Sequence, residues 1–460
     1  MLIKKSSNIA LIDDTGTYLT YLDLIDFVSA VGENLDFRGL LLLKCDNSLA
    51  SISFYIACLE LKIPIMLIDE KTSQTELKNI IYIYKPQYLI VPDSSAFSDL
   101  YENRYSYGGF FLKTQKVVLE NVIFKDLALL LSTSGSTGSR KFVRLSYNNI
   151  VSNTESVVSY LGLTPFDVAI TTLPMSYTFG LSIINTHLYA GAKIVVTKST
   201  LLEKGFWLQM SRQRVSSLSG VPYSFDLMIK TGLLKRSLPD VKTITQAGGN
   251  LSSKLKIKLL DYCDEFQKSL FVMYGQTEAS PRMSFVPPYN LRNKIDSIGV
   301  PIPGGSLEVL SKDGFQCKIG EHGEIIYKGQ NVSLGYSVRA EDLGVGDTLC
   351  GVLATGDVGY VDKDGYFFIV GRNNRFAKVF GLRVSLDELE KLLISNYQSL
   401  DFMCKAEQGV IKVYFSDGSL DIANAKKFLS NMTNIHRTGF EFEHITKITR
   451  SISGKKLYNV

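Results

Sequence analysis

The chain has 460 residues, and at roughly 100–200 residues per domain this length predicts two to four domains or subdomains. Hydrophobic residues make up 45% and charged residues 21%, which excludes extensive disorder. The net charge of +5 is small for a nucleic-acid-binding protein. Scattered cysteines and histidines predict neither a disulfide framework nor a zinc site, and the apolar runs are too short for a membrane span. We therefore expect a soluble, cytoplasmic protein.

The amino-terminal part alternates strand and helix signals. A strand over 9–12 is followed by turn residues at 13–16, and Thr20 is placed to cap a helix. A helix is expected over 54–61, and further strands are expected over 40–43, 63–68 and 88–91. This order predicts mostly parallel sheets covered by helices, the α/β fold class.

The middle of the chain continues in the same way. Apolar strands are expected over 127–131, 168–172, 193–196, 241–246 and 270–273. The alternate lysines Lys254, Lys256 and Lys258 predict the solvated face of a short element.

The pattern changes after about residue 300, where turns and short strands predict a small, barrel-like β part. The Asp364–Gly365 pair, between apolar runs, predicts a hairpin within 359–372. Beyond Arg372 we expect helices over 385–394 and 422–429, a strand over 409–415 and a polar carboxyl-terminal loop. The sequence thus predicts a large domain over 1–371 and a small, mobile α+β domain over 372–460.

The sharpest motif is a Ser/Thr/Gly-rich loop between a buried strand that ends at Leu131 and a helix over 147–161 that Ser146 can cap. Its glycines turn backbone N–H groups inward, its hydroxyls add hydrogen-bonding groups, and Lys141 adds positive charge, which together predict a polyphosphate cradle. The candidate residues are Thr133, Ser134, Gly135, Ser136, Thr137, Gly138 and Lys141. A Walker A loop is disfavoured because Arg140 and Phe142 break its pattern.

This loop resembles the phosphate loop of adenylate-forming enzymes, which include acyl-CoA synthetases, amino-acid adenylation domains and beetle luciferases. Their usual loop reads T-S-G-S-T-G-x-P-K-G, and this chain departs from it at Arg140 and Phe142. The resemblance extends over nearly the whole chain because further motifs follow in the family's order.

Three of these motifs imply the walls of a substrate site. The segment 173–180 resembles the aromatic stretch that lines the acyl pocket, and 220–224 resembles a loop that borders the same pocket. The segment 247–250 resembles the wall against adenine. The implied residues are Tyr177, Thr178, Val221 and Pro222 for the acid, and Gly248, Gly249 and Asn250 for the nucleotide.

The segment 274–278 matches the family's Y-G-x-T-E motif. The resemblance implies that Tyr274 stacks on adenine, that Thr277 contacts the α-phosphate and that Glu278 binds Mg²⁺. Gly275 and Gln276 complete this part of the nucleotide site. A hard cation with a carboxylate and phosphate oxygens is chemically sound.

The carboxyl-terminal motifs imply the rest of the site. Asp357 and Arg372 would contact the ribose, and Asn374 stands at the family's hinge position, which is usually Asp. Lys378, Gly381 and Arg383 would lie near the incoming thiol. Lys455, in a segment similar to P-R-T-x-S-G-K, would be the catalytic lysine, with Lys456 as an adjacent competitor.

The implied reaction is ATP-dependent activation of a small carboxylic acid to an acyl adenylate, with Mg²⁺ and release of pyrophosphate. Rotation about Asn374 would then allow transfer to the thiol of CoA or of phosphopantetheine on a separate acyl carrier protein. Two alternatives stay open: an adenylating enzyme that passes the acyl group to an amine or a partner, and a nucleotide-binding pseudoenzyme. The identity of the acid and the oligomeric state are not indicated.

Overall fold

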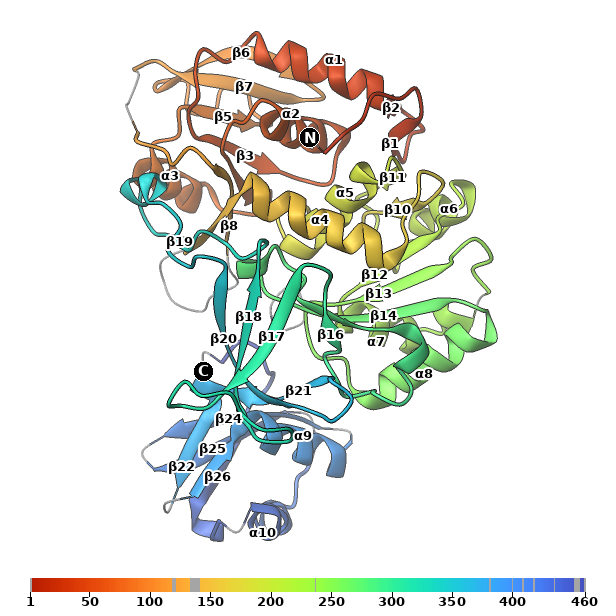
Figure 1. The fold of residues 1–460 in the computed structure, drawn as a ribbon, viewed down its shortest axis with the longest axis vertical. Coiled ribbons are helices and arrows are strands. Elements are labelled where there is room, and N and C mark those ends of the chain that lie inside the picture. Colours follow the sequence, from red (N-terminus) through yellow and green to blue (C-terminus); the bar gives the residue numbers. More distant parts are fainter. Residues whose placement is uncertain are drawn as a thin grey trace. The chain divides into compact units, whose positions relative to one another are not determined.

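The computed structural model describes residues 2–117, 121–132, 141–235, 237–379, 382–398, 400–407, 409–416, 418–433, 435–450 and 456–458 (Figure 1). The chain divides into two compact units. Unit 1 comprises Met1–Ile295, Pro301–Ser306 and Lys328–Leu353, and unit 2 comprises Asp296–Val300, Leu307–Tyr327 and Ala354–Val460. Unit 2 includes residues before 372, and the domain boundary expected between 371 and 372 stays a prediction.

A nine-stranded sheet carries most of the predicted substrate residues. Its strand order is β16 (Val300–Pro301), β15 (Ser284–Val286), β14 (Ser269–Tyr274), β13 (Thr243–Gln246), β12 (Ser217–Gly220), β10 (Val168–Ile170), β11 (Lys193–Val196), β1 (Ile9–Asp13) and β2 (Tyr18–Thr20). The strands from β14 to β1 pair in parallel, while β15 pairs antiparallel with β14 and β2 pairs antiparallel with β1.

The strands on either side of the predicted phosphate loop, β8 and β9, belong to an eight-stranded sheet. Its strand order is β19 (Tyr336–Ser337), β9 (Phe142–Ser146), β8 (Leu127–Ser132), β4 (Ile65–Asp69), β3 (Leu41–Cys45), β5 (Tyr88–Val91), β7 (Phe110–Gln115) and β6 (Tyr101–Tyr107). The central strands β8, β4, β3 and β5 are parallel, and the outer strands are antiparallel.

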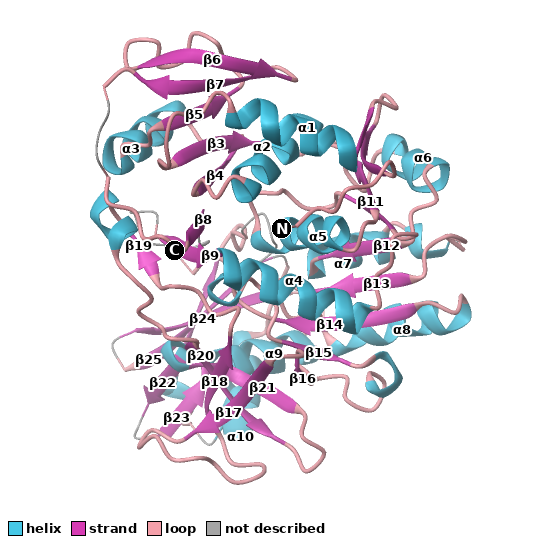
Figure 2. Ribbon diagram, turned by 45° about the horizontal axis from the view of Figure 1, so that its top comes forward, coloured by secondary structure: helices cyan, strands magenta, loops and turns pink. Residues whose placement is uncertain are grey.

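Helices cover both sheets of unit 1 (Figure 2). They are α1 (Tyr21–Gly32), α2 (Leu49–Glu60), α3 (Gln74–Tyr84), α4 (Tyr147–Leu161), α5 (Thr178–Tyr189), α6 (Lys204–Arg212), α7 (Pro222–Lys230) and α8 (Ser253–Glu265). One hydrophobic core joins strands of both sheets with α1, α2, α4 and α5. Every residue of α2 from Leu49 to Leu59 is buried, as expected of a helix that is apolar on all sides. The predicted α/β class is therefore confirmed.

Two predicted helix caps are confirmed. The Thr20 side chain accepts a hydrogen bond from the Asp23 N–H at the start of α1. The Ser146 side chain accepts one from the Asn149 N–H, at 3.0 Å, at the start of α4. In both caps the third helical residue bonds back to the cap, which satisfies backbone groups that the first turn leaves unpaired.

Two features of unit 1 differ from the expected pattern. Between the predicted phosphate loop and the expected helix over 147–161 lies β9, a buried strand antiparallel to β8 that was not predicted. Lys256 is buried and donates to the Ile295 carbonyl at 2.7 Å, so the three lysines do not share a solvated face. Lys256 lies three and seven residues before the buried Leu259 and Cys263, and therefore on the inner face of α8.

Unit 2 contains much of a four-stranded sheet and two smaller sheets. The four strands are β17 (Gly305–Leu310), β18 (Gly323–Gly329), β20 (Val352–Val361) and β21 (Phe367–Arg372). The predicted hairpin at Asp364–Gly365 joins β20 to β21, and Gly365 has a φ of +80°, which favours glycine.

The carboxyl-terminal part is α+β, as predicted. It contains a two-stranded sheet, a three-stranded sheet and two helices: β22 (Phe376–Val379), β23 (Leu382–Ser385), α9 (Leu386–Asn396), β24 (Asp401–Glu407), β25 (Val410–Ser416), α10 (Ile422–Thr433) and β26 (Phe440–His444). The expected polar loop contains the strand β26, which pairs in parallel with β25. Nowhere in the described ranges is a helix long and apolar enough to cross a membrane.

Candidate active site

Four predicted site segments follow the carboxyl ends of neighbouring parallel strands in the nine-stranded sheet. They are 173–178 after β10, 221–222 after β12, 247–250 after β13 and 274–278 at the end of β14. The carboxyl edge of a parallel sheet is where α/β proteins bind ligands, because the loops converge there. The tertiary structure thus brings together residues that are about 100 positions apart in the sequence.

The predicted acid-pocket residues and the adenine wall are in contact. Gly248 has a φ of +80°, and a Cβ atom there would lie 2.5 Å from the Tyr177 hydroxyl and 3.1 Å from Val221 Cγ1. A Cβ atom on Gly249 would lie 3.1 Å from Pro222 Cγ. Burial raises the pKa of Tyr177, so its hydroxyl stays protonated at neutral pH. These glycines keep the space between the two walls open.

The predicted α-phosphate residue contacts the acid side of the site. Thr277 Oγ1 lies 2.9 Å from Thr178 Oγ1, the first residue of α5, so one hydrogen bond joins the two motifs. Gln276 Nε2 donates to the Tyr274 hydroxyl at 3.4 Å. Gly275 is sterically required because a Cβ atom there would lie 1.6 Å from the Pro281 carbonyl oxygen. Asn250 is exposed.

A charged cluster surrounds Tyr336, which the sequence did not single out. The Tyr336 hydroxyl donates to Glu278 Oε1 at 2.9 Å, and Lys141 Nζ lies 3.2 Å from the centre of the Tyr336 ring. Burial and the neighbouring Glu278 raise the pKa of Tyr336, which keeps its hydroxyl a donor. One aromatic residue thus joins the end of the predicted phosphate loop to the predicted metal ligand.

Buried hydrogen bonds fix Tyr336 in this place. Tyr336 pairs with Val143 in the β19–β9 register, two residues beyond Lys141. The buried Arg144 donates to the carbonyls of Tyr336 and Leu334, at 3.0 and 2.7 Å. Tyr336 belongs to none of the sequence motifs described above. Its place beside Lys141 and Glu278 is seen only from the pairing of β19 with β9.

Arg282 is a second residue that sequence reasoning missed. It is fully buried, donates to the Ser182 hydroxyl and lies 4.7 Å from the centre of the Phe179 ring. No carboxylate among the described residues pairs with it, and burial lowers its pKa. The backbone carbonyl of Arg282 accepts from the Asn153 side chain at 2.8 Å, which links the segment before β15 to α4. Arg282 therefore organises the packing behind α5.

The predicted ribose residues belong to unit 2. Asp357 and Arg372 face each other in the β20–β21 register, and Arg372 Nε donates to Asp357 Oδ1 at 3.0 Å. The Asp357 side chain is 4% exposed and that of Arg372 is 53% exposed. The backbone N–H of Asp357 donates to the Thr355 hydroxyl at 3.1 Å, which fixes the start of this motif.

The hinge and thiol-side predictions are described only through the backbone. Asn374 lies in a 3₁₀ turn, Asn373–Arg375, and Lys378 pairs with Arg383 in the β22–β23 register. Residues 133–138, Gly381 and Lys455 lie outside the described residues, so their predicted roles stay predictions. Lys456 is described, and its ammonium group forms an ion pair with Glu390 at 2.8 Å.

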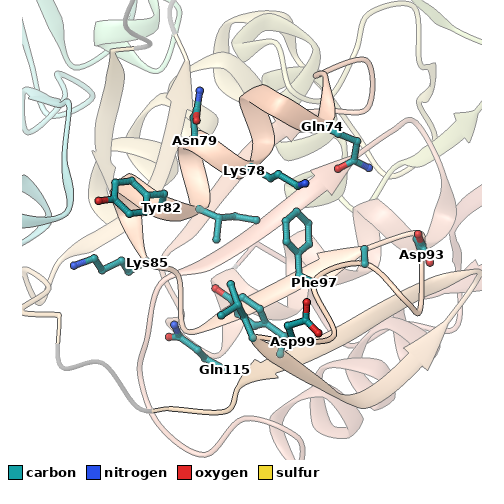
Figure 3. A pocket seen from close by; sticks show the side chains of 13 residues that line it. Gln74, Lys78, Asn79, Tyr82, Lys85, Asp93, Phe97, Asp99 and Gln115 are labelled. Carbon is teal, nitrogen blue, oxygen red and sulfur yellow. The ribbon is translucent and has the colours of Figure 1, made fainter.

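Unit 1 also has a hollow of about 820 Å³ between α3 and the segment 93–101 (Figure 3). Gln74, Lys78 and Tyr82 of α3 line one side, and Phe97 and Asp99 line another. None of the predicted site residues lines it, so it forms no part of the candidate active site.

Within the described part of the chain, no group of three or more His, Cys, Asp and Glu side chains could hold a metal ion. Glu278 presents a carboxylate beside Lys141 and Tyr336. A single carboxylate fits Mg²⁺, which usually takes one or two protein carboxylates and completes its shell with water and substrate phosphates.

Known proteins resemble this chain in sequence and in fold. Residues 4–337 match the model of the family described as "AMP-binding enzyme". A probable 4-coumarate–CoA ligase 1 of Dictyostelium discoideum is 33% identical over 284 residues, which cover 60% of this chain and 50% of that protein. A 2-succinylbenzoate–CoA ligase of Oceanobacillus iheyensis is 26% identical over 391 residues, 83% of this chain and 79% of that protein. The chain spans about half the length of the first curated relatives it matches.

Solved structures share the fold. The o-succinylbenzoate CoA synthetase of Bacillus subtilis, in complex with the acyl-adenylate intermediate OSB-AMP, superposes with a TM-score of 0.77 at 20% identity, over 97% of this chain and 94% of that chain. ATP-bound MatB from Rhodopseudomonas palustris gives a TM-score of 0.76 at 19% identity, over 99% and 95%. The family model covers most of the sequence that builds the site, and the chain belongs to the AMP-binding enzyme family.

Proposed function

We propose that this protein is an AMP-forming acid–thiol ligase. A carboxylate oxygen of the acid attacks the α-phosphorus of ATP, the bond to the bridging oxygen breaks, and pyrophosphate leaves. The thiol of CoA then attacks the acyl carbon, and AMP leaves with the mixed-anhydride oxygen. The observation that carries the proposal is the cluster of Lys141, Tyr336 and Glu278, beside a segment that resembles a phosphate loop.

The physical demand of the first step matches these groups. Two anions must meet, so the step needs positive charge and oriented donors around the phosphoryl oxygens. Lys141 supplies positive charge, Thr277 a hydroxyl, and Glu278 an oxygen ligand for Mg²⁺. The bound Mg²⁺ would neutralise phosphate charge. Asp357 and Arg372 are proposed to hold the ribose, and Lys455 to bridge the acid carboxylate and the α-phosphate.

The second step requires the region after the hinge to change its place. We propose domains over 1–371 and 372–460, with rotation about Asn374 that removes Lys455 and brings the Lys378–Arg383 hairpin to the reaction. The curated relatives bear the names of CoA ligases for three different acids, which supports CoA as the first acceptor to test. A carrier-bound phosphopantetheine, an amine acceptor and a cytoplasmic location remain secondary proposals.

The test is pyrophosphate release by the full chain with ATP and Mg²⁺, over a panel of aromatic, fatty and keto acids, with and without CoA. We expect release that depends on the acid, and an acyl-CoA product by mass spectrometry. Nucleotide binding without acid-dependent release would instead favour the pseudoenzyme alternative.

Lys455→Ala tests the assigned catalytic lysine. We expect adenylate formation to fall by about 10²-fold or more, since a positioned charge in the transition state is lost, with little change in ATP affinity by calorimetry. Lys447→Ala is the matched control because Lys447 is an exposed lysine eight residues earlier. An unimpaired pyrophosphate-exchange rate in Lys455→Ala would rule out this role.

A further inference from the structure

The residues on either side of 451–455 are held against each other. Arg450 and Lys456 form an antiparallel β-bridge, and the Leu457 N–H donates to the Thr449 carbonyl at 2.8 Å. Asp401 of β24 contacts both flanks, through Arg450 Nη2 and through Lys456 Nζ at 3.5 Å. One peptide bond joins Lys456 to Lys455, which lies outside the described residues.

Lys456 itself is strongly anchored. Its side chain is 11% exposed, and its ammonium group lies 2.8 Å from Glu390 Oε2 and donates to the Phe402 carbonyl. An ammonium group that left these acceptors would lose its paired interactions with Glu390 and Phe402. Lys456, which the sequence offers as a competitor for the catalytic role, is thus engaged in a part-buried ion pair.

Glu390 of α9 connects this anchor to the region of the hinge. Its Oε1 accepts from Arg375 Nη2 and from the Cys404 N–H at 2.8 Å, while Oε2 accepts from Lys456. Arg375 also donates to Asp387 at 2.9 Å, and its guanidinium lies 3.8 Å from the centre of the Tyr458 ring. One buried carboxylate therefore joins the residue after Asn374 to the residue after Lys455.

We propose that Arg375, Glu390, Asp401 and Lys456, here named the tail clamp, are positioning residues that hold Lys455 in place for acyl-adenylate formation. This inference rests on the proposed function and assigns to Lys456 the task of orienting its neighbour rather than of touching substrate. Displacement of a reacting group by about 1 Å can slow a step by about 10²-fold, so the clamp acts on the rate of adenylation.

The role differs from a general contribution to stability. Thioester formation from a supplied acyl adenylate does not use Lys455 in the proposed mechanism, whereas adenylate formation does. Loss of the clamp should therefore slow the first half-reaction and spare the second. A purely structural role would reduce both half-reactions in parallel with thermal stability.

The test compares Lys456→Met, Lys456→Arg and the control Lys447→Met in the full chain. Met keeps most of the length of the side chain but removes its charge, and it leaves Glu390 paired with Arg375. Pyrophosphate release with ATP and the best acid of the panel measures adenylation. Conversion of the synthetic acyl adenylate to acyl-CoA measures thioester formation, and hydrogen exchange measures opening of the carboxyl-terminal peptide.

We expect Lys456→Met to slow adenylation at least tenfold, to change thioester formation less than twofold and to increase exchange of the peptide. Lys456→Arg should restore part of the adenylation rate, and Lys447→Met should match the unsubstituted protein. Equal loss of both half-reactions, or no loss of adenylation, would overturn the proposal. If the unsubstituted protein released no pyrophosphate, the proposed function would fail. In that case, increased hydrogen exchange of the carboxyl-terminal peptide in Lys456→Met would show that the clamp is purely structural.

Discussion

Arg372 and Arg375 lie three residues apart and have opposite environments. The Arg372 side chain is 53% exposed and faces one buried carboxylate, Asp357. The Arg375 side chain is 10% exposed and contacts the carboxylates of Asp387 and Glu390 together with the Cys404 carbonyl. Burial acts to lower the pKa of Arg375, but these carboxylates and Tyr458 outweigh it and raise the pKa. The same residue type thus offers an accessible charge at one position and holds the fold together at the other.

The largest expected effect is on stability, from Arg375→Ala. Removal of this buried guanidinium takes an ion-pair partner from both Asp387 and Glu390, although Lys456 still pairs with Glu390. Breaking a buried ion pair from one side costs about 3–5 kcal/mol. We expect the free energy of unfolding of the carboxyl-terminal region to fall by that amount, measured by chemical denaturation or by hydrogen exchange of α9. A change as small as that of an exposed ion pair would contradict the contrast drawn between the two arginines.

The second effect is on ligand affinity, from Asp357→Asn and Arg372→Ala. Hydrogen bonds to charged groups contribute about 1.5–3 kcal/mol, so each change should weaken ATP binding by about tenfold to a hundredfold. Calorimetry with magnesium and ATP measures this directly. Arg372→Ala should lower stability less than Arg375→Ala, because the Arg372 side chain is half exposed, although the change takes a cation from the buried Asp357 carboxylate. Unaltered affinity in both variants would remove the proposed ribose contact.

The smallest effect is expected from Lys412→Ala, which serves as a surface reference in the same region. Lys412 Nζ lies 3.5 Å from Glu407 and 3.3 Å from Glu443, and both glutamates are well exposed. Solvent screens such pairs, so we expect denaturation and ATP binding to match the unsubstituted protein within error. A clear loss of stability here would show that exposure does not separate the two kinds of ion pair.

Local sequence patterns predicted much of the secondary structure correctly. The caps at Thr20 and Ser146, the hairpin at Asp364–Gly365 and most buried strands follow from short-range chemistry, namely cap hydrogen bonds, turn residues and apolar runs. Lys256 was misplaced because its position depends on the face that α8 turns inward. The strand β26 was missed although its apolar and polar residues alternate.

Some parts of the candidate site could likewise be predicted from the sequence, and others were seen only in the tertiary structure. The motifs around Gly248 and Thr277 were found in the sequence because they resemble motifs of the adenylate-forming enzymes, and their roles stay predictions. Tyr336 beside Glu278, and Glu390 between Arg375 and Lys456, were decided only by the tertiary structure. Such pairs join residues 15 to 66 positions apart, and only the packing of strands and helices determines which buried charges meet.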